Sequence, residues 1–125
     1  MKLEYLSDGS AECPLIRLYE FNQSEAKQLR QLVKSLANGG NETIALQNEM
    51  WAEPIGGCSL DLQVGARNDG VRKEQPLRFV CVLTRAGWSN VEGLLEPFSE
   101  SDCFGFQWLT TDGGTQLLIS ANGQW

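Results

Sequence analysis

The clearest periodic segment of the chain is a run of apolar residues at helical spacing over 23–38. Asn22, followed three positions later by Glu25, matches a capping box, in which each side chain binds the backbone N–H of the other residue. Asn38-Gly39-Gly40 is a typical helix stop. The pattern predicts an amphipathic helix between these two signals, with one apolar stripe made by Ala26, Leu29, Leu32, Val33, Leu36 and Ala37.

A second amphipathic segment begins after residue 84. Thr84 is a suitable N-cap, whereas Ser89 followed by Glu92 offers a rival, later start. Proline lacks the backbone N–H that a helix interior requires, so we expect Pro97 to end the segment. The pattern predicts a helix over about 85–95, with an inner stripe made by Trp88, Val91, Leu94 and Leu95.

Each end of the chain carries a pair of strand-like segments around a turn signal. Lys2–Leu6 and Pro14–Phe21 enclose a polar turn that contains a glycine, and the second of them is rich in β-branched and aromatic residues. Phe104–Thr110 and Thr115–Ser120 flank Asp112-Gly113-Gly114, which is a good hairpin signal. Both pairs are predicted to form hairpins.

The middle of the chain predicts three further strands. Glu42–Met50 is the first, and Cys58–Gly65 alternates apolar with polar residues, as a strand with one buried face does. Asn68-Asp69-Gly70 is a turn signal. Leu77–Leu83 is apolar on both of its faces, which predicts a central strand.

The predicted order of elements is ββαβββαββ. An α+β fold satisfies it, with two layers: a mainly antiparallel β-sheet and two helices on one of its faces, because each helix has one stripe to bury. The doubly wound parallel alternative needs strands and helices in alternation, which this chain lacks. No linker or repeat divides the chain, so residues 1–125 are expected to form a single domain.

Composition places the chain among ordinary globular proteins, with 42% hydrophobic and 21% charged residues over 125 positions. The longest apolar run, Phe79–Leu83, is far shorter than a membrane-spanning helix. The first residues contain no apolar stretch of the kind found in secretory signals. We therefore expect a soluble, cytoplasmic protein with no membrane partner.

Charge is acidic overall and divided into blocks. The formal net charge of −6 disfavours nucleic acid as a partner. Residues 35–66 contain no Lys or Arg, and none follows Arg85. Between the two acidic stretches lies a basic one with Arg67, Arg72, Lys73, Arg78 and Arg85. Such blocks can steer a protein partner, although charge runs more often mark a solvated face.

The chain contains no histidine, which is the sequence's strongest statement about chemistry. It removes the usual Ser-His and Cys-His nucleophiles and the metal sites that need imidazole. None of the four cysteines forms a Cys-x-x-Cys pair, and Cys58 and Cys81 lie in phase with apolar neighbours, as core residues do. Phosphate-binding glycine motifs are also missing. We expect no cofactor, no metal and no assigned catalytic residue.

Carboxylates, tryptophans and loops are the remaining candidates for a binding site. The segment between two predicted strands from Trp51 to Gly57 combines an aromatic anchor with Glu53, although Trp51 could simply cover the end of the core. Trp108 and Asp112 are the other candidates, in and beside the last hairpin. Two carboxylates can also do acid–base work if they share a cleft.

Three hypotheses follow for function. The first is a non-catalytic interaction module for a protein partner, with an acidic, immunity-type inhibitor of a basic toxin as a special case. The second is a small-molecule-binding domain or carboxylate-based enzyme, with Trp51 or Trp108 in the wall of its pocket and Glu53 or Asp112 at the mouth. The third is a homo-oligomer in which a second subunit covers the outer face of the strand at 77–83.

Overall fold

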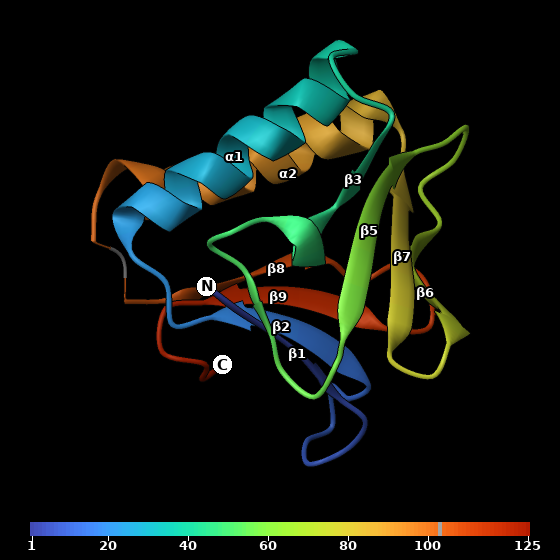
Figure 1. Ribbon diagram of the computed structural model, residues 1–125, viewed down its shortest axis with the longest axis vertical. Helices are drawn as coiled ribbons and strands as arrows, with labels where there is room; N and C mark the ends of the chain where they lie inside the picture. Colours follow the sequence, from blue (N-terminus) through green and yellow to red (C-terminus); the bar gives the residue numbers. More distant parts are fainter. Residues whose placement is uncertain (103) are drawn as a thin grey trace.

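The computed structural model describes residues 1–102 and 104–125 and is built from two helices and nine short strands. Figure 1 shows the helices α1 (Gln23–Asn38) and α2 (Arg85–Glu100) side by side above the strands. The strands are β1 (Lys2–Leu6), β2 (Leu15–Tyr19), β3 (Thr43–Ala45), β4 (Glu53–Pro54), β5 (Ser59–Val64), β6 (Gly70–Gln75), β7 (Arg78–Leu83), β8 (Phe106–Thr110) and β9 (Gln116–Ser120).

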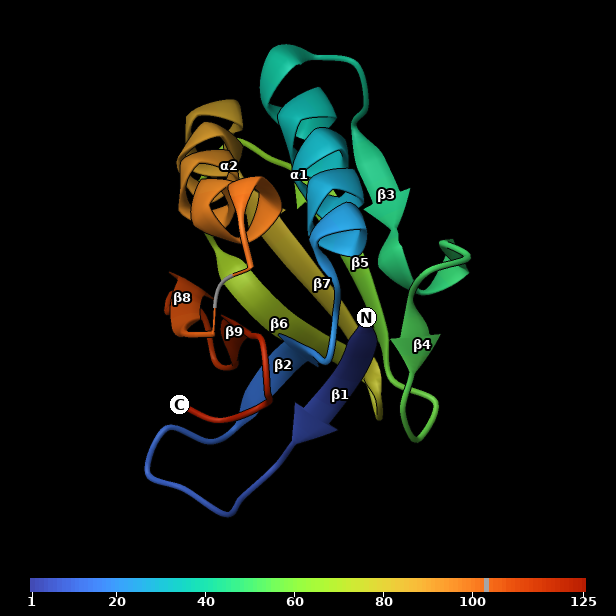
Figure 2. The ribbon, with the colours of Figure 1, turned by 90° about the vertical axis from the view of Figure 1, so that its left-hand side faces the viewer.

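The strands form two mixed sheets, and the α+β class with two helices is confirmed. One sheet has five strands in the order β4-β1-β2-β9-β8, and the other has four in the order β3-β5-β7-β6. Both predicted terminal hairpins, β1–β2 and β8–β9, are antiparallel pairs. Each helix connects a strand of one sheet to a strand of the other (Figures 1 and 2).

Helix α1 has the bounds that its end signals predict. The backbone N–H of Glu25 donates to Asn22 Oδ1 at 2.8 Å, and the N–H of Asn22 donates to Glu25 Oε1 at 3.0 Å. Both halves of the capping box are therefore formed. At the other end Gly39 adopts φ 91°, a left-handed conformation that glycine takes without steric cost.

Helix α2 starts at its predicted cap but extends past Pro97 to Glu100, so the predicted end was wrong. Contacts of the last turn with other elements hold it in place. The Phe98 ring packs edge-on against Phe21 at 5.9 Å between centroids, and the carbonyl of Ser99 accepts a hydrogen bond from the Gln23 side chain at 3.1 Å. These contacts offset the backbone hydrogen bond that proline cannot make.

The core lies between the helices and both sheets. Trp88 is at its centre, 1% exposed, with its indole N–H donating to the carbonyl of Gln63 at 2.8 Å. Cys58 and Cys81 are buried in the same cluster, as predicted, while Cys13 is a half-buried free thiol. The fourth cysteine, Cys103, lies outside the described residues.

Two segments between the helices differ from their predictions. Of the strand expected over Glu42–Met50 only β3 forms, and a 3-10 turn follows it at Leu46–Asn48. Within that turn Gln47 Oε1 accepts the backbone N–H of Leu60 at 3.0 Å, where further strand pairing would otherwise occur. Strand β6 follows the predicted turn at Asn68-Asp69-Gly70, where the sequence predicts no element. Its polar sequence lacks strand periodicity, and pairing with β7 stabilises it.

The outer face of β7 is already covered within one chain. Val80 and Val82 point away from the core residues of β7, yet they are only 3% and 8% exposed. Val80 lies between Asp61 on β5 and Arg72 on β6, and Val82 lies between Gln63 on β5 and Gly70 on β6. Burial of these valines therefore needs no second subunit.

Ion pairs join the two helices across their outer surface. Arg30 on α1 contacts Glu92 at 2.7 Å, Glu100 at 2.9 Å and Glu96 at 3.7 Å, all on α2. Its guanidinium also donates to Ser99 Oγ at 3.0 Å. One cation thus offsets part of the acidic charge on α2. Neither helix is long and apolar enough to cross a membrane, a finding that covers residues 1–102 and 104–125.

We expect Arg30→Gln to lower the free energy of unfolding by about 1–2 kcal/mol, because Glu92 then stays partly buried without its partner. Urea unfolding followed by tryptophan fluorescence measures this effect. Lys27→Gln, an exposed change one turn earlier on α1, is the matched control and should shift stability by less than about 0.5 kcal/mol. Equal effects of the two substitutions would contradict the role given to Arg30.

The buried thiols should resist alkylation in the folded protein. Burial raises the pKa of Cys58 to about 11 and that of Cys81 to about 12, so both stay protonated, and hence unreactive, at a pH of about 8. We expect iodoacetamide to leave both residues unmodified in buffer and to modify both in urea, as mapped by mass spectrometry. Equal labelling rates in the two conditions would refute the buried placement.

Candidate functional site

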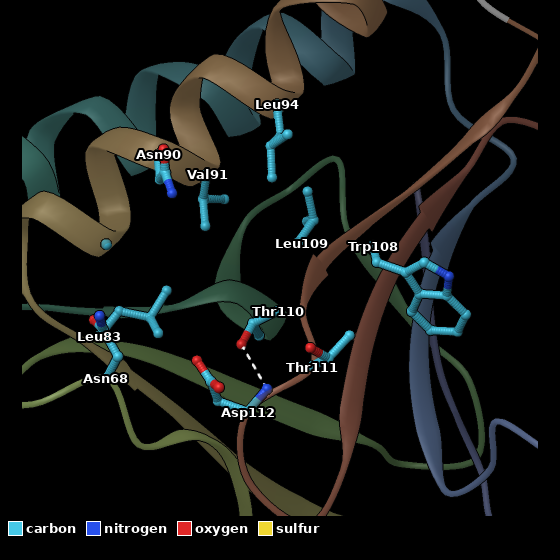
Figure 3. Close-up of a pocket in the computed structure, with 11 residues that line it drawn as sticks. Asn68, Leu83, Asn90, Val91, Leu94, Trp108, Leu109, Thr110, Thr111 and Asp112 are labelled. Atoms are coloured by element: carbon cyan, nitrogen blue, oxygen red, sulfur yellow. Dashed lines mark hydrogen bonds between the residues drawn. The ribbon is translucent and has the colours of Figure 1, made fainter.

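A cleft lies beneath helix α2, between the end of β8 on one side and the end of β7 with the turn before β6 on the other. Its volume is about 320 Å³, at the lower end of the range for small-molecule sites. Figure 3 shows polar and apolar side chains from three parts of the chain around it. The lining residues are Asn68, Leu83, Gly87, Asn90, Val91, Leu94, Trp108, Leu109, Thr110, Thr111 and Asp112.

Two glycines with positive φ allow the loops below the cleft to interlock. A Cβ on Gly70 (φ +75°) would lie 2.1 Å from the carbonyl oxygen of Asp112, and one on Gly113 (φ +81°) would lie 2.5 Å from that of Val71. Any side chain at either position would therefore collide with backbone. This close approach lets Val71 and Thr115 form a β-bridge between the two sheets.

Asn68 fixes one wall of the cleft to the start of α2. Its Oδ1 accepts hydrogen bonds from the backbone N–H of Thr84 at 2.9 Å and from Thr84 Oγ1 at 3.1 Å. A Cβ on Gly87 would lie 2.4 Å from the same oxygen, so this helical position must be small. The sequence predicts Asn68 only as part of a turn and does not indicate this contact with Gly87.

Asp112 is the one predicted acid that lies at the cleft. Its backbone N–H donates to Thr110 Oγ1 at 3.2 Å, and Figure 3 shows its carboxylate across the cleft from Asn68. Asp112 is also the only titratable residue among those that line the cleft in the described chain. The cleft therefore lacks the second carboxylate that acid–base chemistry of the paired type requires.

Trp108 also lines the cleft, but its ring does not form the aromatic wall that the sequence suggested. In Figure 3 the indole points away from the cleft, on the other side of β8 from Leu109. Successive residues of a strand point to opposite faces, so burial of Leu109 in the core turns Trp108 outward. Apolar surface in the cleft comes instead from Leu83, Val91, Leu94 and Leu109.

Trp51 and Glu53 lie elsewhere and do not join this site. Trp51 is half-buried against the core, and its carbonyl oxygen accepts a hydrogen bond from the α-amino group of Met1 at 2.9 Å. That amino group also pairs with Glu25 at 2.6 Å. Glu53 is exposed on β4, which pairs in parallel with β1. The packing interpretation of Trp51 thus accounts for its position.

The edge of β8 is the feature that sequence reasoning missed. The two sheets end in four edge strands, β4 and β8 in one and β3 and β6 in the other. Three of them have features that disfavour pairing with other chains. Strand β3 has only three residues, β4 has two of which one is proline, and β6 exposes charged side chains. Strand β8 has five residues without proline or charge, and its only irregularity of pairing in the described chain lies between Trp108 and Thr110. Phe106, the first residue of β8, is 46% exposed, and Phe104 just before the strand is 86% exposed. No residue from Phe104 to Thr111 is charged.

Some of the charges that lie in blocks along the sequence pair with opposite charges of the same chain. Arg85, from the basic block, pairs with Glu42 and donates to the carbonyl of Leu36 at 2.8 Å. Arg72 contacts Glu74 at 3.2 Å, and Arg30 binds three carboxylates of α2. Within residues 1–102 and 104–125, no group of three potential metal ligands comes together.

Gly70→Ala should lower the free energy of unfolding by more than about 2 kcal/mol, because the new methyl group strains a left-handed backbone and meets the carbonyl of Asp112. Gly114→Ala is the matched control, since nothing lies within 4 Å of its added Cβ. It should be close to neutral. Urea unfolding of both variants measures the difference, and a neutral Gly70→Ala would refute the interlock.

Comparisons of the chain with protein-family models, with curated proteins and with solved structures found no match. Its own contacts, burial and charge are therefore the basis for assigning a function.

Proposed function

We propose that this protein is a non-catalytic interaction module that binds an extended segment of a protein partner along the free edge of β8. The observation that carries this proposal is an edge strand with two exposed aromatic rings at its start, Phe106 on β8 and Phe104 just before it, in a stretch that has no charge. An uncharged apolar edge of this kind is costly to keep unless it is used, because it invites pairing with other chains.

Backbone hydrogen bonding at this edge supports strand addition. In the described chain β8 pairs only with β9, so its other side offers unpaired backbone groups. The carbonyl of Trp108 accepts a hydrogen bond from the side chain of its own neighbour Gln107 at 3.0 Å, in place of a bond from another strand. An added strand can replace that bond and supply others, which is how sheet edges bind peptides.

Side chains along β8 define the chemistry of the partner segment. Phe106 and Trp108 are two residues apart, so they project from the same face of the strand and offer apolar contacts at alternate positions. Beyond them the edge leads to the cleft with Thr111 and Asp112. The preferred segment is an extended, largely uncharged one with apolar residues at every second position, followed by a hydroxyl, amide or basic side chain.

Binding of a small polar molecule in the cleft is the second candidate function. It is favoured by the convergence of amide, hydroxyl and carboxylate groups from Asn68, Asn90, Thr111 and Asp112 over an apolar floor. The acidic, immunity-type inhibitor has less support, because Arg30 lies among three of the carboxylates that would form an acidic face and reduces its negative charge.

Titration with a peptide tests the proposal. The probe is an acetylated and amidated peptide of alternating valine and threonine, followed by amide-resolved NMR of the protein. We expect saturable shifts at residues 104–108, with a dissociation constant of about 1 mM or tighter. Phe106→Glu should abolish them, because it places a charge on the edge.

Leu77→Glu is the matched control, since Leu77 is 40% exposed on the β6–β7 turn and the change adds the same charge there. It should bind the peptide as the natural protein does. Shifts at β6 instead of β8, or none at any peptide concentration, would overturn the proposal. Shifts confined to Asn68, Asn90 and Asp112 would favour the cleft as the binding site.

A further inference from the structure

We infer that the segment bound by β8 is the β8 strand of a second copy of this chain, so that two five-stranded sheets join into one continuous sheet. The inference rests on the proposed function, because it uses the same edge and names its occupant. The two strands run antiparallel about a twofold axis, the commonest symmetry of soluble dimers.

Charge is the first argument for a second copy. In an antiparallel twofold pair residue i of one chain faces residue j of the other and j faces i, so like charges near the centre of a strand face one another. Self-pairing of β6 about its centre would bring Arg72 and Lys73 of one copy close to Arg72 and Lys73 of the other. Among the described strands, the edge strands with five or more residues are β6 and β8. Strand β8 avoids this repulsion, because no residue from Phe104 to Thr111 is charged.

Net charge makes the pairing selective. Each copy carries a formal charge of −6, which opposes contact between molecules at most orientations. The flanking residues Asp102 and Asp112 mark the ends of the uncharged stretch. Contact between copies is therefore favoured where aromatic surface is exposed and charge is missing, and β8 combines both conditions.

Burial of aromatic rings is the second argument. Phe104, just before β8, is 86% exposed, Phe106 at the start of β8 is 46% exposed, and Trp108 in the middle of β8 is half-buried. Antiparallel pairing gathers Phe106 and Trp108 of both copies on one face of the joined sheet. Leu109 and Thr110 are buried in each chain, so the contact uses the Phe104–Trp108 part of the edge.

The position of β8 leaves room for a second molecule. Figure 2 shows β8 at the outer margin of the molecule, below α2 and beside the strands of its own sheet. The contact is short, so the dimer belongs with small interfaces that bury less than about 1,200 Å² and bind weakly. We expect a dissociation constant of about 1–100 µM.

Sedimentation equilibrium over a range of protein concentrations tests the inference. The expected mass rises from 13.9 kDa toward twice that value, and hydrogen exchange at residues 104–108 slows as the dimer forms. Phe106→Glu should remain monomeric at every concentration, while Leu77→Glu should dimerise like the natural protein. Circular dichroism of both variants verifies that each is folded.

If the mass of the unmodified protein stays at 13.9 kDa up to a concentration of about 1 mM, the inference that a second copy binds β8 is refuted. Dimerisation that persists in Phe106→Glu or is lost in Leu77→Glu also refutes it. The peptide titration separates this failure from failure of the proposed function. If the protein is monomeric but still binds the valine–threonine peptide at β8, the proposed interaction module stands and only the second copy is refuted. If it is monomeric and binds nothing at β8, both proposals are refuted.

Discussion

The close approach of two loop backbones at Gly70 and Gly113 is the constraint on which the shape of this molecule depends. The helices link strands of different sheets. The relative position of the two sheets is fixed by a direct contact between them, the β-bridge between Val71 and Thr115. Strand β9 begins beside β6 at this point, and β8 lies one strand further out. The cleft and the free edge of β8 are therefore two results of the same junction.

Local signals account for the parts of the fold that could be predicted. Helix α1 starts and stops as expected because its cap and its glycine stop act within a few residues. The turn of α2 after Pro97 depends on Phe21 and Gln23, which are distant in the sequence, and no local pattern encodes those contacts. Strand β6 pairs with the next strand, β7, but its polar sequence has no periodicity that indicates a strand. Two of the four candidate site residues, Trp108 and Asp112, do lie at the cleft, yet the outward turn of the indole follows from how β8 packs.

Folding places opposite charges together that are far apart in the sequence. Arg30 pairs with the acidic stretch of α2, and Arg85 pairs with Glu42. The charge blocks that look like docking surfaces in the sequence are therefore partly offset by opposite charges in the folded protein. Uncharged residues cannot be cancelled in this way. The stretch from Phe104 to Thr111 is uncharged in the sequence and still presents exposed aromatic residues in the folded molecule. It therefore defines the proposed interface better than the charge blocks do.

The parallel pairing of β2 with β9 has a consequence for biosynthesis. These strands lie side by side from Leu15 opposite Gln116 to Tyr19 opposite Ser120, so β2 must wait for a segment made about a hundred residues later. A nascent chain on the ribosome can form the β1–β2 hairpin early, but one flank of that hairpin stays open until β9 has emerged. Completion of the five-stranded sheet is therefore a late step in the maturation of this protein.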